Sequence, residues 1–154
     1  MTGVTAHGAT AAGMTAPRMR ARPVPAQHDQ PFWDGLGQHR MVLPYCAECA
    51  AFRYPPGPRC PRCLSAVVSW RECPGGGTLW SWATARRAFA PGLGVPYTVV
   101  QVELDVQPGL LVDSTLAAAG DTPLRLGLPL SAVYLDDPRG FTVHAFRPAA
   151  GGQS

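Results

Sequence analysis

Two closely spaced pairs of cysteines constrain what this 154-residue chain can fold into more than any other feature. Cys46 and Cys49 form the first pair, and Cys60 and Cys63 form the second. A gap of two residues lets both sulfurs of one tight turn face the same point, so two such turns joined by a hairpin can surround a metal ion. Two disulfides, or four unrelated buried thiols, are the alternatives. We predict a structural Zn²⁺ site, because four sulfur ligands leave no position open for a substrate, with iron in a rubredoxin-like site as the competing metal.

The residues after each cysteine pair depart from the usual zinc-knuckle pattern. Glycine is common there because the backbone needs a left-handed conformation, but this chain has Ala50 and Leu64. We expect a strained knuckle backbone with the same four ligands. In small zinc peptides metal binding supplies about 10–16 kcal/mol, and here it would contribute to folding a segment with little core of its own.

The charge and hydropathy patterns exclude several classes of protein. The formal net charge is +3, and the N-terminal segment carries Arg18, Arg20 and Arg22, so the rest of the chain is nearly neutral. A nearly neutral body argues against a surface that follows nucleic-acid phosphates. There is no apolar run long enough for a membrane span and no secretory signal at the start, and thiols at metal spacing fit a reducing compartment. We expect a cytoplasmic protein that binds neither membrane nor nucleic acid.

The chain before the cysteines divides into a tail and a short helix. Residues 1–28 are rich in Ala, Gly, Thr and Pro, and we predict a disordered tail there. Asp29 suits an N-cap, and a helix is predicted from there to about Gln38. One face of this helix carries Phe32, Trp33 and Leu36. That face either covers the ribbon's own core or fits a groove on a partner protein.

Residues 29–76 are predicted to form this helix and a rubredoxin-like zinc ribbon. Strands are expected over 40–45 and 66–72, with 52–58 as the far side of the hairpin. Cys73 lies outside the paired spacing and is read as a small buried hydrophobe. The run from Pro74 to Gly77 is predicted to be a flexible joint between two modules.

Residues 77–148 are predicted to form a five-stranded OB-fold barrel, followed by a tail over 149–154. Short strands separated by turn residues indicate an all-β barrel or sandwich, and five of them after a zinc ribbon suggest an OB-fold. The expected strands are 78–89, 97–105, 110–116, 128–135 and 141–146. The connection 117–127 holds glycine and proline and is too broken for a helix. The predicted fold is therefore mainly β, with a short N-terminal helix.

We find no catalytic constellation in the sequence. His39 and His144 stand apart from any nucleophile pattern, no serine lies in a GxSxG elbow, and Gly75–Gly77 lacks the Lys and Ser/Thr of a phosphate loop. We predict that the chain by itself is not an enzyme.

From Phe32 to Pro148 the chain resembles the family called domain of unknown function 35. Besides the cysteine pairs, the matching segments are Phe32–Leu36, Tyr54–Pro56, Gly77–Ser81, Pro96–Val100, Val102–Asp105 and Phe146–Pro148. The resemblance implies a rubredoxin-like zinc ribbon joined to an OB-fold. It also implies a small subunit in a hetero-oligomer with a thiolase-fold acyltransferase or aldolase, where the large subunit carries the catalytic groups. Some members are fused to hydratase domains, for which we expect no room here.

Our preferred hypothesis is a non-catalytic accessory subunit that supports an acyl-CoA site of such an enzyme, in steroid, lipid or polyketide metabolism. Candidate contacts to the partner or to a CoA phosphate are Arg86, Arg87, Phe89, Tyr97, Phe32 and Trp33. Solvated charges beside a surface loop are the alternative for the two arginines. A nucleic-acid-binding module, with Trp80, Trp82 and Phe89 stacking on bases, is the competing hypothesis. An electron carrier with iron at the four thiolates is a third.

Overall fold

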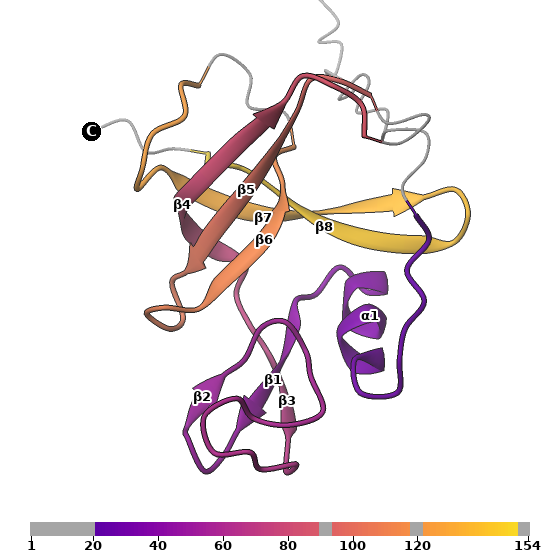
Figure 1. The fold of residues 1–154 in the computed structure, drawn as a ribbon, viewed down its shortest axis with the longest axis vertical. Coiled ribbons are helices and arrows are strands. Elements are labelled where there is room, and N and C mark those ends of the chain that lie inside the picture. The colour runs from indigo at the N-terminus through magenta and orange to yellow at the C-terminus, as the bar shows by residue number, and fades with distance from the viewer. Residues whose placement is uncertain (1–20, 90–93, 118–121, 151–154) are drawn as a thin grey trace, which may run out of the picture.

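The computed structural model describes residues 21–89, 94–117 and 122–150, and it is mainly β (Figure 1). One short helix and eight strands make up these residues. In chain order they are α1 (Gln30–Gly37), β1 (Val42–Cys46), β2 (Ala51–Phe52), β3 (Ser69–Glu72), β4 (Gly76–Ala85), β5 (Tyr97–Leu104), β6 (Leu111–Thr115), β7 (Pro129–Asp137) and β8 (Phe141–Pro148). None of the described helical segments is long and apolar enough to cross a membrane.

The strands form two antiparallel sheets. The ribbon sheet has the order β2-β1-β3, and the larger sheet has the order β6-β5-β4-β7-β8. Its two edges meet, because Leu116 bridges Phe146 in parallel and the Ala117 N–H donates to the Phe146 carbonyl at 2.6 Å. The larger sheet is thus a nearly closed five-stranded barrel with the strand order of an OB-fold. The predicted fold class is confirmed.

The first helix begins where the sequence predicts. Asp29 is its N-cap residue and Pro31 lies in its first turn, but the Asp29 carboxylate accepts from the backbone N–H of Ala26 at 2.6 Å and not from the helix. The helix packs against β1 and β8, so it lies between the ribbon sheet and the barrel. Its buried face therefore serves both parts of the molecule.

The helix, the ribbon and the barrel share one hydrophobic core. Buried side chains from the first part of the chain and from the barrel belong to a single cluster, which includes Phe32, Leu36, Met41, Leu43, Cys73, Leu79, Val100, Val102, Leu130 and Phe146. Cys73 is 2% exposed, which confirms its interpretation as a small buried hydrophobe. Folding of either part therefore buries apolar surface of the other.

The predicted flexible joint at Pro74–Gly77 is wrong. Gly76 and Gly77 are the first residues of β4, and Gly77 pairs with Leu104 on one side and Leu130 on the other. A Cβ atom on Gly77 would lie 2.5 Å from the Glu103 carbonyl oxygen. Glycine is present here because neighbouring backbone approaches closely, and not because the chain bends freely. The module boundary between residues 76 and 77 stays a prediction.

Two polar contacts connect the helix and ribbon to the barrel. The Gln107 side chain accepts from the Phe52 N–H at 2.7 Å and donates to the Phe52 carbonyl at 3.2 Å. After the helix, the His39 ring contacts the Asp136 carboxylate at 2.9 Å and stacks on Tyr134, with ring centroids 5.5 Å apart. These contacts add polar links to the shared hydrophobic core of the two parts.

The strand limits differ from the predicted ones in both sheets. In the barrel, the expected strand 78–89 is β4, which begins at Gly76 and ends at Ala85. In the ribbon, the expected strand 66–72 is shortened to β3, which begins at Ser69. Val67 and Val68 lie before it and are exposed. Within the connection 117–127, residues 118–121 lie outside the described part, and residues 122–127 contain no helix.

Candidate metal centre

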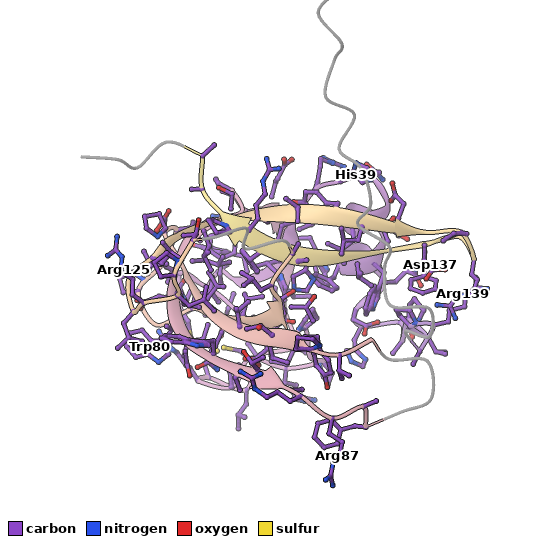
Figure 2. All side chains as sticks on the ribbon, turned by 90° about the horizontal axis from the view of Figure 1, so that it is seen from above. His39, Trp80, Arg87, Arg125, Asp137 and Arg139 are labelled. Atoms are coloured by element: carbon purple, nitrogen blue, oxygen red, sulfur yellow. The ribbon has the colours of Figure 1, made fainter. Side chains whose placement is uncertain are left out.

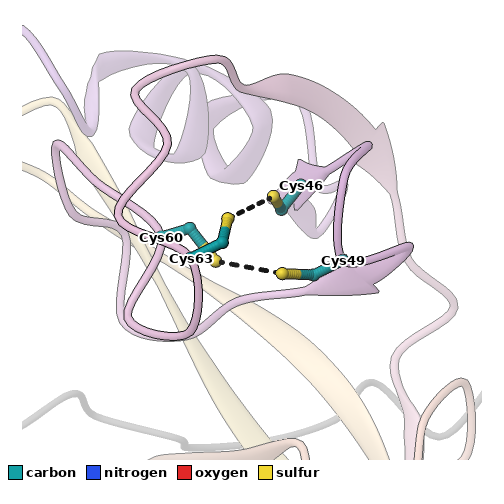
Figure 3. A group of neighbouring side chains, drawn as sticks. All are labelled: Cys46, Cys49, Cys60 and Cys63. Carbon is teal, nitrogen blue, oxygen red and sulfur yellow. Dashed lines mark hydrogen bonds between the residues drawn. The ribbon is translucent and has the colours of Figure 1, made fainter.

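The four paired cysteines converge on one point. Their sulfur atoms all lie within 4.8 Å of one another, and Cys46–Cys63 and Cys49–Cys60 are separated by 3.7 and 3.8 Å (Figure 3). A disulfide would bring two sulfurs to about 2.05 Å, so these cysteines are not disulfide-bonded. Four sulfurs at about 2.3 Å from a central ion are about 3.8 Å apart along a tetrahedral edge. The donor set fits a tetrahedral metal.

The local backbone explains how the sulfurs are positioned. Cys46 ends β1 and the turn after it leads through Cys49 to β2. In the second turn the Leu64 N–H donates to the Cys60 carbonyl at 2.9 Å. Ala50 has φ 47° and Leu64 has φ 61°, so both adopt the left-handed conformation in which glycine is usual. The expected strain in the knuckle backbone is confirmed at both residues.

The backbone also sets the acidity of the thiols. The N–H groups of Cys63 and Arg62 point at Cys60 and lower the pKa of its thiol to about 6. At Cys63 the largest influence, the Ser65 N–H, lowers the pKa, but contacts with the other thiols and desolvation together raise it to about 12. The four thiols thus interact strongly with one another, and the backbone N–H groups favour a thiolate at Cys60. Metal binding at such a site releases protons.

The donor set determines what the centre can do. Cys46 and Cys60 are buried, Cys49 is half-buried and Cys63 is exposed. Four protein sulfurs complete a tetrahedral shell and leave no position for a substrate. A bound metal would supply cross-linking of the two turns, and the four cysteines would hold it. The geometry supports a structural role.

Phe32 and Trp33, predicted as contacts on the helix, have different surroundings. Phe32 is 3% exposed, and its ring packs edge-on against Tyr54 and His144 at centroid distances of 6.2 and 5.8 Å. This side chain belongs to the internal core. Trp33 is half-buried, and its indole nitrogen has no hydrogen-bond partner among the described residues. It lines an open depression together with Arg22 and Phe141.

The other predicted contacts lie at the far end of the β4–β5 hairpin. Arg86 and Arg87 are exposed, Phe89 is 79% exposed and Tyr97 is half-buried. Figure 2 shows Arg87 extending away from the body of the molecule. Residues 90–93 of the predicted contact loop lie outside the described residues. The structure thus gathers four of the predicted residues in one region, distant in sequence from the helix residues.

Exposed apolar side chains accompany them on the same hairpin. We call this set the hairpin surface; it consists of Trp80, Trp82, Phe89, Val95 and Val99, and it includes both faces of the β4–β5 pair, because Trp82 pairs with Val100 and not with Val99. Trp80 is 54% exposed, and a register shift between Leu79 and Ser81 leaves it without an opposite residue on β5. The shift interrupts the alternation that would place Trp80 and Trp82 on the same face.

Sequence reasoning missed Arg53. This side chain is 6% exposed and lies between the ribbon and the barrel. The available signal was a charged residue between Phe52 and Tyr54 in an otherwise apolar part of the hairpin. Nothing in that pattern distinguishes a buried arginine from an exposed one.

Two family models match consecutive parts of the chain. The rubredoxin-like zinc ribbon domain of ChsH2 matches residues 33–69, and the C-terminal OB-fold domain of ChsH2 matches residues 70–135. Their junction lies a few residues before the boundary that we predict from the glycine run.

Curated relatives are named as enzyme subunits. The probable enoyl-CoA hydratase alpha subunit of Thermomonospora curvata is 34% identical over 130 residues, which cover 83% of this chain and 40% of that protein. The 3-oxo-4,17-pregnadiene-20-carboxyl-CoA hydratase alpha subunit of Mycobacterium tuberculosis is 27% identical over 132 residues, which cover 86% of this chain and 41% of that protein. The chain therefore spans about two fifths of the length of these relatives.

Solved structures show the same architecture. A chain of the Ltp2-ChsH2(DUF35) aldolase superposes with a TM-score of 0.72 and 31% identity, over 82% of this chain and 98% of that chain. A DUF35 protein from Sulfolobus solfataricus shares the fold, with a TM-score of 0.56 and 13% identity over 80% of this chain and 86% of that one. With its cysteine cluster, its barrel and these matches, the chain belongs to the ChsH2 (DUF35) family, which joins a rubredoxin-like zinc ribbon to an OB-fold.

Proposed function

We propose that this chain is an accessory subunit that binds and supports a thiolase-fold enzyme acting on acyl-CoA, either an acyltransferase or an aldolase of steroid, lipid or polyketide metabolism. The observation that carries the proposal is the match over 98% of one chain of an aldolase named for two components, Ltp2 and ChsH2. The names of both curated relatives add CoA thioesters as the substrate class. The catalytic groups are assigned to the partner.

The proposed metal is Zn²⁺, bound by the four cysteines in a structural role. The sulfur separations of 3.7 and 3.8 Å support a tetrahedral ion. The zinc-ribbon match favours zinc over iron. Metal analysis of the purified chain should find about one zinc per chain and a colourless solution, whereas iron bound by four thiolates would colour it.

The hairpin surface is the proposed docking region. Its exposed apolar side chains include Trp80 and Phe89, at 54% and 79% exposure, and exposed aromatic side chains are common anchors of protein association. Arg86, Arg87 and Tyr97 lie at its end and are the proposed contacts to the partner or to a CoA phosphate. Trp33, a half-buried residue of α1, is a further proposed contact to the partner.

The proposed contribution to the reaction is positioning. A rigid subunit that completes the wall of an acyl-CoA site can hold the thioester in a reactive orientation, and orientation alone lowers a barrier by several kcal/mol. A metal-linked ribbon that shares its core with a barrel suits this role, because side chains of both parts pack in one hydrophobic cluster.

Co-expression with thiolase-fold acyltransferases and aldolases from the same genome tests the proposal. The expected result is a stable hetero-oligomer on gel filtration, with acyl-CoA turnover only when both proteins are present. Turnover of a CoA thioester by this chain alone would contradict the accessory role. So would a partner that retains full activity after this chain is removed.

A further inference from the structure

Arg53 is a buried cation without a partner inside the described part of the chain. It is 6% exposed, and none of its three guanidinium nitrogens has a hydrogen-bond partner there. A charged group removed from water without compensation is strongly unfavourable, so such groups are normally paired. Arg53 therefore calls for an anionic group that the isolated chain does not itself supply.

A pocket lies beside this arginine. Its volume is about 230 Å³, and Arg53, Arg59 and Arg62 are among its lining residues. No Asp or Glu belongs to its described lining. Two carboxylates act on lining residues from outside the pocket: Glu103 accepts from the Gly109 N–H at 2.7 Å, and the charge of Asp113 contributes to the raised pKa of Tyr54, which is mainly due to burial. The pocket thus combines one buried and two exposed arginines.

Hydrogen bonds join the two walls of the pocket. One wall comes from the ribbon around Phe52 and Cys60, and the other comes from the turn between β5 and β6. The two hydrogen bonds between Gln107 and Phe52 fix these walls to each other. A volume of about 230 Å³ lies below the 300–1,000 Å³ typical of sites that enclose a drug-sized ligand, so the pocket suits one compact group.

The metal centre does not by itself satisfy Arg53. Four thiolates around a divalent ion carry a net charge of about −2, which attracts nearby cations. However, no hydrogen bond joins the Arg53 guanidinium to a cysteine sulfur in the described residues. Arg59 is partly engaged, because it donates to the Leu64 carbonyl at 3.1 Å.

We propose that the pocket between ribbon and barrel is a phosphate-binding site in which Arg53 is the principal ligand-binding residue and Arg59 and Arg62 assist. The Arg53 side chain turns its planar guanidinium toward the anion and binds two of its oxygens. A phosphate group offers enough oxygens for all three arginines. The phosphate is either the free ion or the terminal group of a larger metabolite such as CoA. The proposal does not depend on the thiolase-fold partner.

Thermal unfolding of the zinc-loaded full chain tests the site, with inorganic phosphate exchanged for chloride at constant ionic strength. Phosphate should raise the unfolding temperature of the wild type, because a ligand that binds only the folded state stabilises it. In Arg53→Met the shift should disappear, and calorimetric affinity for phosphate should fall by about tenfold or more. Without phosphate this variant should be at least as stable as the wild type, since an apolar side chain replaces an unpaired charge.

Arg71→Met is the matched control. Arg71 is an exposed arginine of the same ribbon that stacks on Tyr45 at 3.5 Å, and its loss should leave the phosphate shift unchanged. Phosphate stabilisation that is absent in the wild type, or equal in Arg53→Met, would overturn the proposal. So would a loss of zinc from Arg53→Met, which would make Arg53 a counterion of the metal centre.

A measurement on the wild type keeps the test independent of variant folding. In ¹H–¹⁵N spectra of arginine side chains, the Arg53 Nε–H signal should move on titration with inorganic phosphate while the Arg71 signal stays in place. Equal movement of both signals, or of neither, would reject the site. Tighter binding of CoA than of dephospho-CoA, lost in Arg53→Met, would identify a terminal phosphate as the source. Equal affinity for CoA and dephospho-CoA would identify the free phosphate ion as the ligand.

Discussion

Ala50 and Leu64 adopt a left-handed backbone at the metal-binding turns although neither is glycine. Each follows the second cysteine of a pair, with φ 47° and 61°. A side chain in this conformation crowds the following carbonyl at a cost of about 1–2 kcal/mol. The metal-binding turns therefore oppose part of the stability that the metal provides.

Leu64→Gly should stabilise the metal-loaded protein by about 0.5 kcal/mol, because relief of the strain exceeds the entropy that glycine costs. Little burial is lost, since Leu64 is 67% exposed. Ala66→Gly is the control, because Ala66 lies nearby and does not have a positive φ. This variant should lose about 0.5–1 kcal/mol of unfolding free energy. Chemical denaturation of both variants measures the difference, and a destabilised Leu64→Gly would contradict the strain.

The fifth cysteine provides a second residue-scale test. Cys46→Ser should abolish stoichiometric metal binding and unfold the ribbon, because a thiolate ligand is lost. Cys73→Ala should keep the metal, because Cys73 is not one of the four convergent residues, and should lose about 1 kcal/mol of stability from its buried position. Metal analysis and near-ultraviolet circular dichroism separate the two outcomes. Metal loss in both variants would contradict the assignment.

Residues differ in how far the sequence predicts them. The cysteines were predictable because the metal requires a fixed spacing along the chain, and the strained Ala50 and Leu64 follow from the same geometry. Arg53 was not, because its burial depends on a wall supplied by the turn after β5, far away in the sequence. The convergence of Arg86, Arg87 and Tyr97 at one hairpin end follows from the pairing of β4 with β5.

At the scale of elements, the start of β4 shows that a run of glycines can indicate close backbone packing as well as a flexible joint. Short stretches of strand character separated by turn residues predicted the five barrel strands. The glycine run before them predicted a joint, since sequence alone does not reveal that Gly77 lies between two strands. The bulge at Trp80 was equally invisible, because it arises from the register of the partner strand.

Gly77→Ala should destabilise the protein by about 1–3 kcal/mol, because the new methyl group meets neighbouring backbone. Its Cβ would lie 2.5 Å from the Glu103 carbonyl oxygen and 2.7 Å from a Val102 methyl. Gly57→Ala is the matched control, since no atom lies within 4 Å of its added Cβ. Equal stability of the two variants in thermal unfolding would restore the flexible-joint interpretation.

At the scale of the whole molecule, the contact between His39 and Asp136 joins the end of α1 to the barrel and makes stability depend on pH. Hydrogen bonds from His39 and then Thr142 lower the pKa of Asp136 below its ordinary value of 3.8. The folded state therefore favours the carboxylate. Its contribution is fully present above the ordinary pKa and is lost as the pH falls through the lower folded-state value.

Asp136→Asn should accordingly unfold at a lower temperature than the wild type at about pH 6, with the difference fading as the pH falls below about 3.8. The effect should be small, because both side chains are more than half exposed. Asp34→Asn is a control, because Asp34 lies on α1 and its carboxylate contacts only the nearby Gln30 in the described structure. A difference independent of pH would contradict the electrostatic origin.

The hairpin surface yields a prediction about assembly. Trp80→Ser with Phe89→Ser should weaken binding to the thiolase-fold partner by about tenfold or more, because exposed aromatic side chains dominate association energy. Stability of the free chain should change little, since both side chains are mostly exposed. Val67→Ser, at a site 67% exposed on the ribbon, is the control. Unchanged affinity of the double variant would place the docking region elsewhere.

The core that runs from Phe32 and Leu43 to Val100 and Phe146 has a consequence for evolution and engineering. A zinc ribbon transplanted from a related protein would bring core side chains that do not fit the barrel side chains of the recipient. Grafts cut at the junction should therefore aggregate unless the facing side chains travel with them. We expect related proteins to keep the zinc ribbon and the barrel together. Substitutions of core residues in one of them should be compensated by substitutions of the residues that they contact in the other.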